Sequence, residues 1–290
     1  MTTLAAVGLG YCARHLIATR PQAFTEVIAT ARTEEGIARL PPGTRGFRFD
    51  GTCLSPELAD ALAEADVLLV SAPPDAAGDP LLRLGADAIA WGRTRQVVYL
   101  TTLGVYGDHQ GAWVDEASLA RAGTPRLERR LQAEAAWFEF GHRHHMAVAA
   151  LRLAGIYGPG RNALAQLEAG DARIIDRPGQ VFNRIHVEDI SRAIMAVVEQ
   201  GFDGILNVAD DLPTAPGEPV AYAARLLGLP VPPAIPFEDA ARTMSPMALS
   251  FWGASKRVSN RRLKEDLGVR LAFPSYREGL DALAAAGEGR

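Results

Sequence analysis

The chain has 290 residues, of which 48% are hydrophobic, and this is enough material for one large domain or two smaller ones. Its formal net charge of −4 provides no broad basic surface, so nucleic-acid binding is not expected. No segment approaches the roughly 20 continuous apolar residues of a membrane span, the N-terminal run is not expected to be a signal peptide, and a pair of cysteines, Cys12 and Cys53, fits a reducing cytoplasm.

The first apolar run breaks at Gly8, and a second glycine follows at Gly10 with a small residue at Ala13. This Gly-x-Gly-x-x-Ala pattern predicts a strand, a tight turn and a helix start, which together hold a pyrophosphate. Gly8 allows the sharp turn, Gly10 removes the Cβ that would block the phosphates, and the helix N-terminus favours an anion. We therefore expect Gly8, Gly10, Tyr11 and Cys12 to contact a dinucleotide, although an ordinary glycine turn would show the same pattern.

The second apolar run, residues 27–30, leads to Arg32 at the point where an NAD-selective fold places an acid. A carboxylate hydrogen-bonds the ribose hydroxyls of NAD, whereas an arginine pairs with the 2′-phosphate of NADP through charge-assisted hydrogen bonds. Arg32 thus favours NADP over NAD. The alternative is a solvated arginine at the start of a helix.

Apolar runs alternate with helical patterns over the first half of the chain, which is the layout of a doubly wound parallel α/β sheet. The expected strands are residues 4–7, 27–30, 47–49, 67–71, 97–101 and 148–153. Ligands bind where such strands end, so the small and polar residues that follow them are candidates for cofactor binding, with plain loop chemistry as the alternative. These candidates are Asp50, which could reach an adenine ring, and Ser71, Ala72, Pro73 and Thr101.

The pattern changes beyond Arg152. Residues 155–160 are a predicted loop, residues 185–189 open a predicted amphipathic helix, and proline density is high beyond Asp210. We expect a dinucleotide-binding Rossmann domain formed by residues 1–154 plus about 184–209, and a smaller substrate-capping domain formed by residues 155–183 plus 210–290.

Four motifs follow one another along the chain: GLG at 8–10, TTLGVYGD at 101–108, LRLAGIYGPG at 151–160 and IHVED at 185–189. With these motifs the chain resembles the extended or atypical branch of the short-chain dehydrogenase/reductase superfamily, the NAD-dependent epimerase/dehydratase family. Within that branch it is similar to the nucleoside-diphosphate-sugar epimerase-like proteins, over nearly its whole length. The resemblance implies a nicotinamide cofactor that Gly155 also contacts, a hydroxyl- or carbonyl-bearing substrate such as a nucleotide sugar, and a homodimer through the helices near residues 79–91 and 125–143.

The chemistry of this family uses a Tyr-x-x-x-Lys pair together with a Ser or Thr that fixes the substrate oxygen. Thr102, four residues before Tyr106, matches the Ser/Thr position, but Arg126 and Arg130 stand in the register of the tyrosine and the lysine. Arg130 would still contact ribose or phosphate, whereas a guanidinium stays protonated and is no ordinary general acid. Tyr106 is one alternative proton donor, although a tyrosine in this motif also packs structurally in the family.

Three functions therefore remain open. The first is an NADP-dependent oxidoreductase or epimerase with Thr102 as a catalytic residue. The second is an NADP-binding sensor or scaffold without catalysis, and the third is a substrate-binding pseudoenzyme with a vestigial cofactor site. A metal site is not expected, because the histidines at 142, 144 and 145 cluster where cations favour a helix C-terminus and lack further ligands.

Overall fold

The computed structural model describes residues 2–289, so residues 1 and 290, at the outer ends of the two predicted domains, lie outside it. The chain divides into two compact units. The sheet unit comprises the residues up to Thr102, Thr124–Arg152 and Ser191–Leu206, and the second unit comprises Leu103–Gly123, Leu153–Ile190 and the residues from Asn207 onward. The stretch 103–123, which the sequence analysis assigned to the dinucleotide-binding domain, groups with the second unit.

A seven-stranded sheet in the described residues has the strand order β11-β7-β5-β4-β1-β2-β3. Its strands are β1 (Thr3–Val7), β2 (Glu26–Ala31), β3 (Thr44–Arg48), β4 (Val67–Val70), β5 (Gln96–Thr102), β7 (Ala147–Leu153) and β11 (Gly204–Val208). The neighbours from β5 through β4, β1 and β2 to β3 pair in parallel. This confirms the predicted doubly wound α/β fold.

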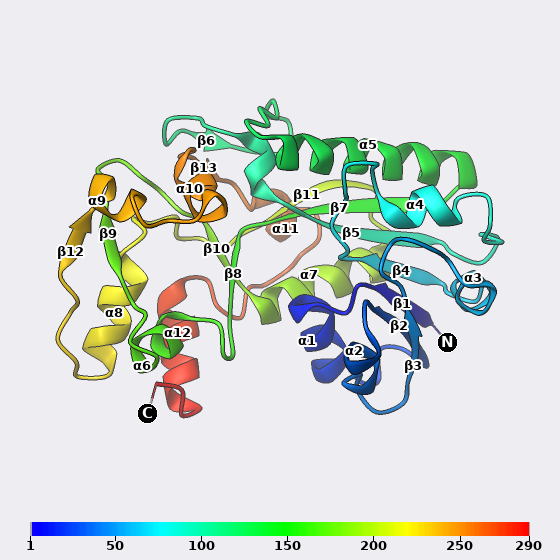
Figure 1. Cartoon of the computed structure of the whole chain (residues 1–290), viewed down its shortest axis with the longest axis horizontal. Helices are drawn as coiled ribbons and strands as arrows, with labels where there is room; N and C mark the ends of the chain where they lie inside the picture. The colour runs from blue at the N-terminus through cyan, green and yellow to red at the C-terminus, as the bar shows by residue number, and fades with distance from the viewer. Residues whose placement is uncertain (1, 290) are drawn as a thin grey trace. The chain divides into compact units, whose positions relative to one another are not determined.

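Helices cover both faces of this sheet (Figure 1). They are α1 (Tyr11–Thr19), α2 (Glu34–Ala38), α3 (Pro56–Ala63), α4 (Pro80–Gly85), α5 (Pro125–His144) and α7 (Val187–Gln200). In Figure 1, α3, α4 and α5 lie on one face, and α1, α2 and α7 lie on the other. Because both faces are covered, the central strands are continuous apolar runs, and every residue of β1 is buried.

The longest helix, α5, shows how local chemistry sets an element. Thr124 accepts a hydrogen bond from the Leu127 backbone N–H, and Pro125 stands at the first helical position, where its missing N–H costs nothing. The helix ends at His144, and its C-cap residue His145 adopts the left-handed conformation. Its buried residues recur at helical spacing and pack on the sheet: Leu127, Ala133, Glu134, Trp137, Phe140 and Gly141.

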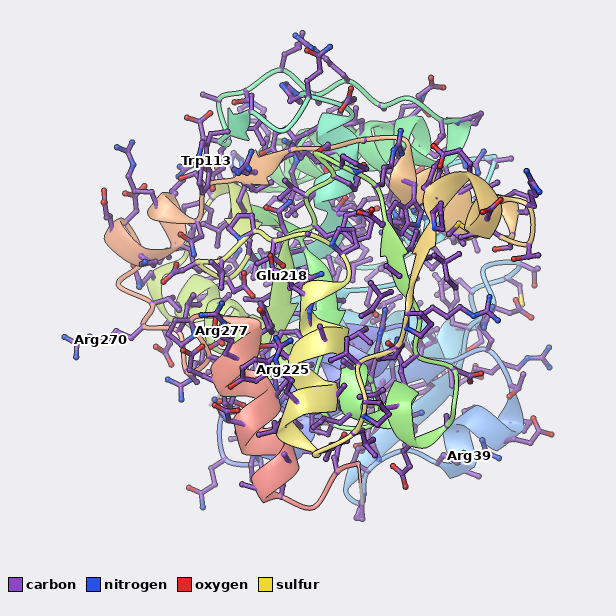
Figure 2. All side chains as sticks on the ribbon, turned by 90° about the vertical axis from the view of Figure 1, so that its left-hand side faces the viewer. Arg39, Trp113, Glu218, Arg225, Arg270 and Arg277 are labelled. Atoms are coloured by element: carbon purple, nitrogen blue, oxygen red, sulfur yellow. The ribbon has the colours of Figure 1, made fainter. Side chains whose placement is uncertain are left out.

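The second unit is built from short elements. They are η1 (Leu103–Tyr106), β6 (Trp113–Val114), β8 (Gly155–Tyr157), α6 (Ala163–Glu168), β9 (Ile174–Asp176), β10 (Arg184–His186), α8 (Glu218–Leu226), β12 (Ala234–Pro236), α9 (Phe237–Ala241), α10 (Pro246–Trp252), β13 (Arg257–Val258), α11 (Arg261–Glu265) and α12 (Tyr276–Ala285). The strands pair in parallel as β10 with β8, β12 with β9 and β13 with β6. A small apolar core joins α6, α8 and α12, and Figure 2 labels Glu218 and Arg225 on α8 and Arg277 on α12.

Two predicted elements were wrong in their extent. The first residues of the predicted loop 155–160 form β8, because β10 supplies a pairing partner. The predicted helix near 79–91 is α4, which ends at Gly85, and the indole of Trp91 then donates hydrogen bonds to the carbonyls of Gly85 and Ala86. Among residues 2–289, no helix is long and apolar enough to span a membrane.

Candidate functional site

The strand order places a switch point between β1 and β4. The chain builds β1, β2 and β3 outward in one direction and then returns to the other side of β1 with β4. In open α/β sheets, ligands bind beyond the carboxyl ends of the strands at such a point, because the connections diverge there and leave a crevice. The residues that follow β1 and β4 are the glycine turn and Ser71, which the sequence singled out.

Gly8 is required by the fold itself. Its φ of +86° lies in the region that favours glycine, and a Cβ there would lie 2.9 Å from the backbone nitrogen of Ala72. The turn is further held by the Gly8 N–H, which donates to Thr30 Oγ1 at 2.9 Å, and by the Ser71 hydroxyl, which donates to the Gly8 carbonyl. Gly8 therefore carries no information about a ligand.

Gly10 differs, because nothing in the fold requires a glycine there. Its φ of −84° and ψ of −169° suit any residue, and the heavy atom nearest to an added Cβ would be Ser71 Oγ at 3.9 Å. Gly10 is exposed and is the N-cap of α1, whose first turn holds no acidic residue. The missing side chain thus leaves open the approach to a helix N-terminus, which favours an anion.

The neighbouring predicted cofactor contacts surround this turn. Tyr11 is half-buried and begins α1, and Cys12 is buried beside it. The backbone N–H groups of Ser71 and Ala72 both donate to the Val7 carbonyl, at 3.0 and 3.2 Å, which fixes the end of β4 against the end of β1. Pro73 follows as an exposed residue.

Arg32 and Asp50 follow β2 and β3. Arg32 is exposed just beyond the end of β2, and it forms no ion pair within residues 2–289. Asp50 is exposed but engaged locally, since its carboxylate accepts from the Thr52 N–H at 3.0 Å and from Arg48 Nη2 at 3.2 Å. Hydrogen bonds from Thr52 lower the pKa of Asp50, so this carboxylate is ionised and stabilises the turn that follows β3.

The end of β5 carries a buried polar network. Thr101 donates from Oγ1 to Glu134 Oε1 at 2.8 Å, and Arg152 Nη2 lies 2.7 Å from Glu134 Oε2. Glu134 and Arg152 are each 4% exposed at the side chain, so this is a buried ion pair. Thr102, the half-buried last residue of β5, carries a second hydroxyl at the strand end.

Arg126 and Arg130, which the sequence analysis aligned with the tyrosine and the lysine of the resembled family, both lie on α5. Arg130 donates from Nη1 to the carbonyl of Leu100 at 3.0 Å, which fixes it beside the end of β5. Arg126 stands one turn earlier on the same face and is half-buried. Burial, together with the charges of Arg130 and Arg129, lowers the pKa of Arg126, although an arginine remains protonated at ordinary pH.

Two of the predicted site residues belong to the second unit. Tyr106 is fully buried and donates from its hydroxyl to Asn207 Oδ1 at 2.7 Å, which is the packing role that the sequence also allowed. Gly155 is exposed at the start of β8, where its N–H donates to the Asn183 carbonyl. Sequence reasoning missed Lys256, which is buried and donates from Nζ to the Gly107 carbonyl at 3.0 Å. Burial lowers the pKa of Lys256 to about 8.

Among residues 2–289, no three or more His, Cys, Asp or Glu side chains come together in a way that could hold a metal ion. The phenol of Tyr157, the last residue of β8, donates to the Ser275 carbonyl at 3.1 Å. The chemistry that the sheet unit offers is therefore anion binding at the glycine turn, with Thr102 and the arginines of α5 beside the end of β5.

Comparison with curated proteins finds two kinds of relative, while no protein-family model matches the chain. Protein YeeZ of Escherichia coli strain K12 is 27% identical over 292 residues, which is 94% of this chain and 97% of YeeZ. A 3-diazoavenalumate denitrifying reductase from a Streptomyces species is 29% identical over 136 residues, which is 45% of this chain and 45% of the reductase. The match thus spans less than half the length of the reductase.

Solved structures extend the comparison. A conserved protein of unknown function from Silicibacter pomeroyi DSS is 42% identical, with a TM-score of 0.88, and covers 99% of this chain and 100% of its own. MoeE5 in complex with UDP-glucose and NAD is 24% identical, with a TM-score of 0.76, over 98% of this chain and 97% of MoeE5. The UDP-N-acetylglucosamine 4-epimerase of Bacillus cereus is 14% identical, with a TM-score of 0.77, over 99% of each chain.

These likenesses define the protein at two levels. The fold is the one seen in solved nucleotide-sugar epimerases and dehydratases, such as the Bacillus cereus epimerase and a dTDP-glucose 4,6-dehydratase from Bacillus anthracis. At the level of sequence, the chain belongs to the same family as the Silicibacter pomeroyi protein.

Proposed function

We propose that the chain binds a nicotinamide dinucleotide at the glycine turn and transfers hydride to or from a hydroxyl or carbonyl group of a small molecule. The observation that carries this proposal is Gly10, since a glycine at this exposed N-cap serves neither backbone conformation nor packing. A pyrophosphate on the N-terminus of α1 would need the space that a side chain would fill. The proteins of similar fold that carry NAD in their solved structures support the same cofactor class.

We further infer that the cofactor is NADP. Arg32 follows the strand whose end lies against the adenosine ribose in folds of this class, and it is exposed without an ion pair in the described part of the chain. The guanidinium of Arg32 can donate two hydrogen bonds to a 2′-phosphate. The C-terminal end of β2 offers no carboxylate for the ribose hydroxyls of NAD. Arg32→Ala should therefore weaken NADPH binding much more than NADH binding.

The substrate side rests on Thr102. A hydroxyl at the end of β5 would hold the substrate oxygen, and nucleotide sugars or ketones are the class of substrate that the fold suggests. The Streptomyces relative is named as a reductase, which supports an oxidoreductase. A homodimer through α4 and α5 belongs to the same proposal and is tested by the molecular mass in solution.

A second candidate is a dinucleotide-binding sensor without catalysis. One observation favours it: α5 contains neither tyrosine nor lysine, and Arg126 and Arg130 occupy their register. Fluorescence titration with NADPH and NADH, followed by NADPH oxidation with a panel of nucleotide sugars and ketones, separates the two candidates. Turnover that Thr102→Val abolishes supports the enzyme, binding without any turnover supports the sensor, and absence of binding at millimolar cofactor contradicts both.

A further inference from the structure

The buried stripe of α5 continues toward its N-terminus as three arginines. Ala133 and Trp137 pack in the core of the sheet unit, and Arg126, Arg129 and Arg130 extend the same face by one turn. We call these three residues the arginine cluster. The Arg130 guanidinium donates to the Leu100 carbonyl at 3.0 Å, which anchors the cluster beside the end of β5.

The arginine cluster contains a buried nitrogen that has no hydrogen-bond partner within residues 2–289. Neither Arg129 nor Arg130 forms an ion pair in the described residues, and Arg129 Nε is buried there without a hydrogen-bond partner. A buried donor without a partner is costly, and like charges at positions i, i+3 and i+4 of a helix repel. Burial and this repulsion also lower the pKa of Arg126. A helix face of this kind gains stability from a bound anion.

The acids nearby are already engaged. The Asp79 carboxylate accepts from the backbone N–H groups of Leu81 and Leu82 and, at 3.1 Å, from the Trp137 indole. Glu134 is paired with Arg152 and accepts from Thr101. Neither carboxylate forms an ion pair with Arg129 in the described residues.

We propose that the arginine cluster is a binding site for an oxyanion carried by the substrate, either a carboxylate or a phosphoryl group. A guanidinium donates two parallel hydrogen bonds to such a group, and the half-buried setting strengthens them. The proposal depends on the proposed function only for the identity of the ligand, which we take to be the substrate and not the dinucleotide. It assigns an anion-binding role to the helix turn where the family carries its proton-transfer pair.

Calorimetric titrations with inorganic phosphate and with malonate test the site in the wild type and in Arg129→Gln. Arg143→Gln is the matched control, since Arg143 lies on the same helix, is exposed and pairs with Glu139. Arg129→Lys is a second variant that keeps the charge and removes the planar fork, and thermal unfolding verifies that each variant folds. We expect Arg129→Gln to weaken binding of the preferred anion by about tenfold or more, because it removes one charge-assisted hydrogen bond. Arg143→Gln should leave the affinity unchanged.

The preferred probe distinguishes a phosphoryl group from a carboxylate. Unchanged affinity of both anions in folded Arg129→Gln overturns the proposal, as does a loss confined to NADPH, which would assign Arg129 to the cofactor. If the wild type binds neither NADPH nor NADH but still binds an anion through Arg129, the proposed function fails and the anion site stands.

Discussion

Replacement of Glu134 by glutamine isolates the buried ion pair that joins α5 to β7. In the wild type, Arg152 Nη2 and Nε lie 2.7 and 3.2 Å from Glu134 Oε2, and both side chains are 4% exposed. Glu134→Gln preserves the shape but leaves a guanidinium that cannot lose its proton in a water-poor site. Removal of one partner of such a pair costs about 3–5 kcal/mol of the free energy of unfolding.

Urea unfolding followed by circular dichroism measures this cost. The control is Glu139→Gln on the same helix, because Glu139 and Arg143 are 73% and 62% exposed at the side chain and their ion pair is worth only about 0.5 kcal/mol. The double variant Glu134→Gln, Arg152→Met should be more stable than Glu134→Gln alone, since it also removes the buried charge that Glu134 pairs with in the wild type. Equal free energies of unfolding for Glu134→Gln and Glu139→Gln would refute the reasoning.

Two further predictions concern pH. Burial raises the pKa of Asp210 from 3.8 to about 8, so ionisation opposes folding and stability falls as the pH rises between these values. Asp210→Asn should therefore gain stability over the wild type by up to about 1.4 kcal/mol per pH unit in urea titrations from pH 5 to 8. A pH-independent difference between the two would contradict this prediction. Lys256 has the opposite sign, because burial lowers its pKa from 10.5 to about 8 and the wild type gains stability over Lys256→Met as the pH rises through that interval. A flat difference in thermal unfolding between pH 8 and 10 would argue against the lowered pKa of Lys256.

Local chemistry made the glycine turn and most of the sheet predictable. The run ending at Val7, the turn at Gly8 and the helix from Tyr11 depend on neighbouring residues, and the parallel sheet follows from apolar runs that are buried on both faces. The outcome at Gly10 is more informative than the motif, because the structure shows that only one of the two glycines is required by the backbone.

The features that the sequence did not predict depend on tertiary partners. Glu134 and Arg152 are 18 positions apart and meet only when α5 packs beside β7. The strand at Gly155 exists because β10 pairs with it, and Lys256 is buried by the turn at Gly107, far away in sequence. Periodicity and motifs do not report such long-range pairings, so the sequence did not predict them.

The affinity of Gly10→Ala for NADPH tests the central claim most directly. Alanine fits the backbone at this exposed N-cap, so the melting temperature should stay close to that of the wild type. Gly92→Ala is the matched control, since Gly92 is exposed in the same unit with no atom within 4 Å of an added Cβ. We predict that Gly10→Ala weakens NADPH binding by about tenfold or more, whereas Gly92→Ala binds NADPH with wild-type affinity. Equal binding of NADPH by Gly10→Ala and the wild type would contradict a dinucleotide at this turn.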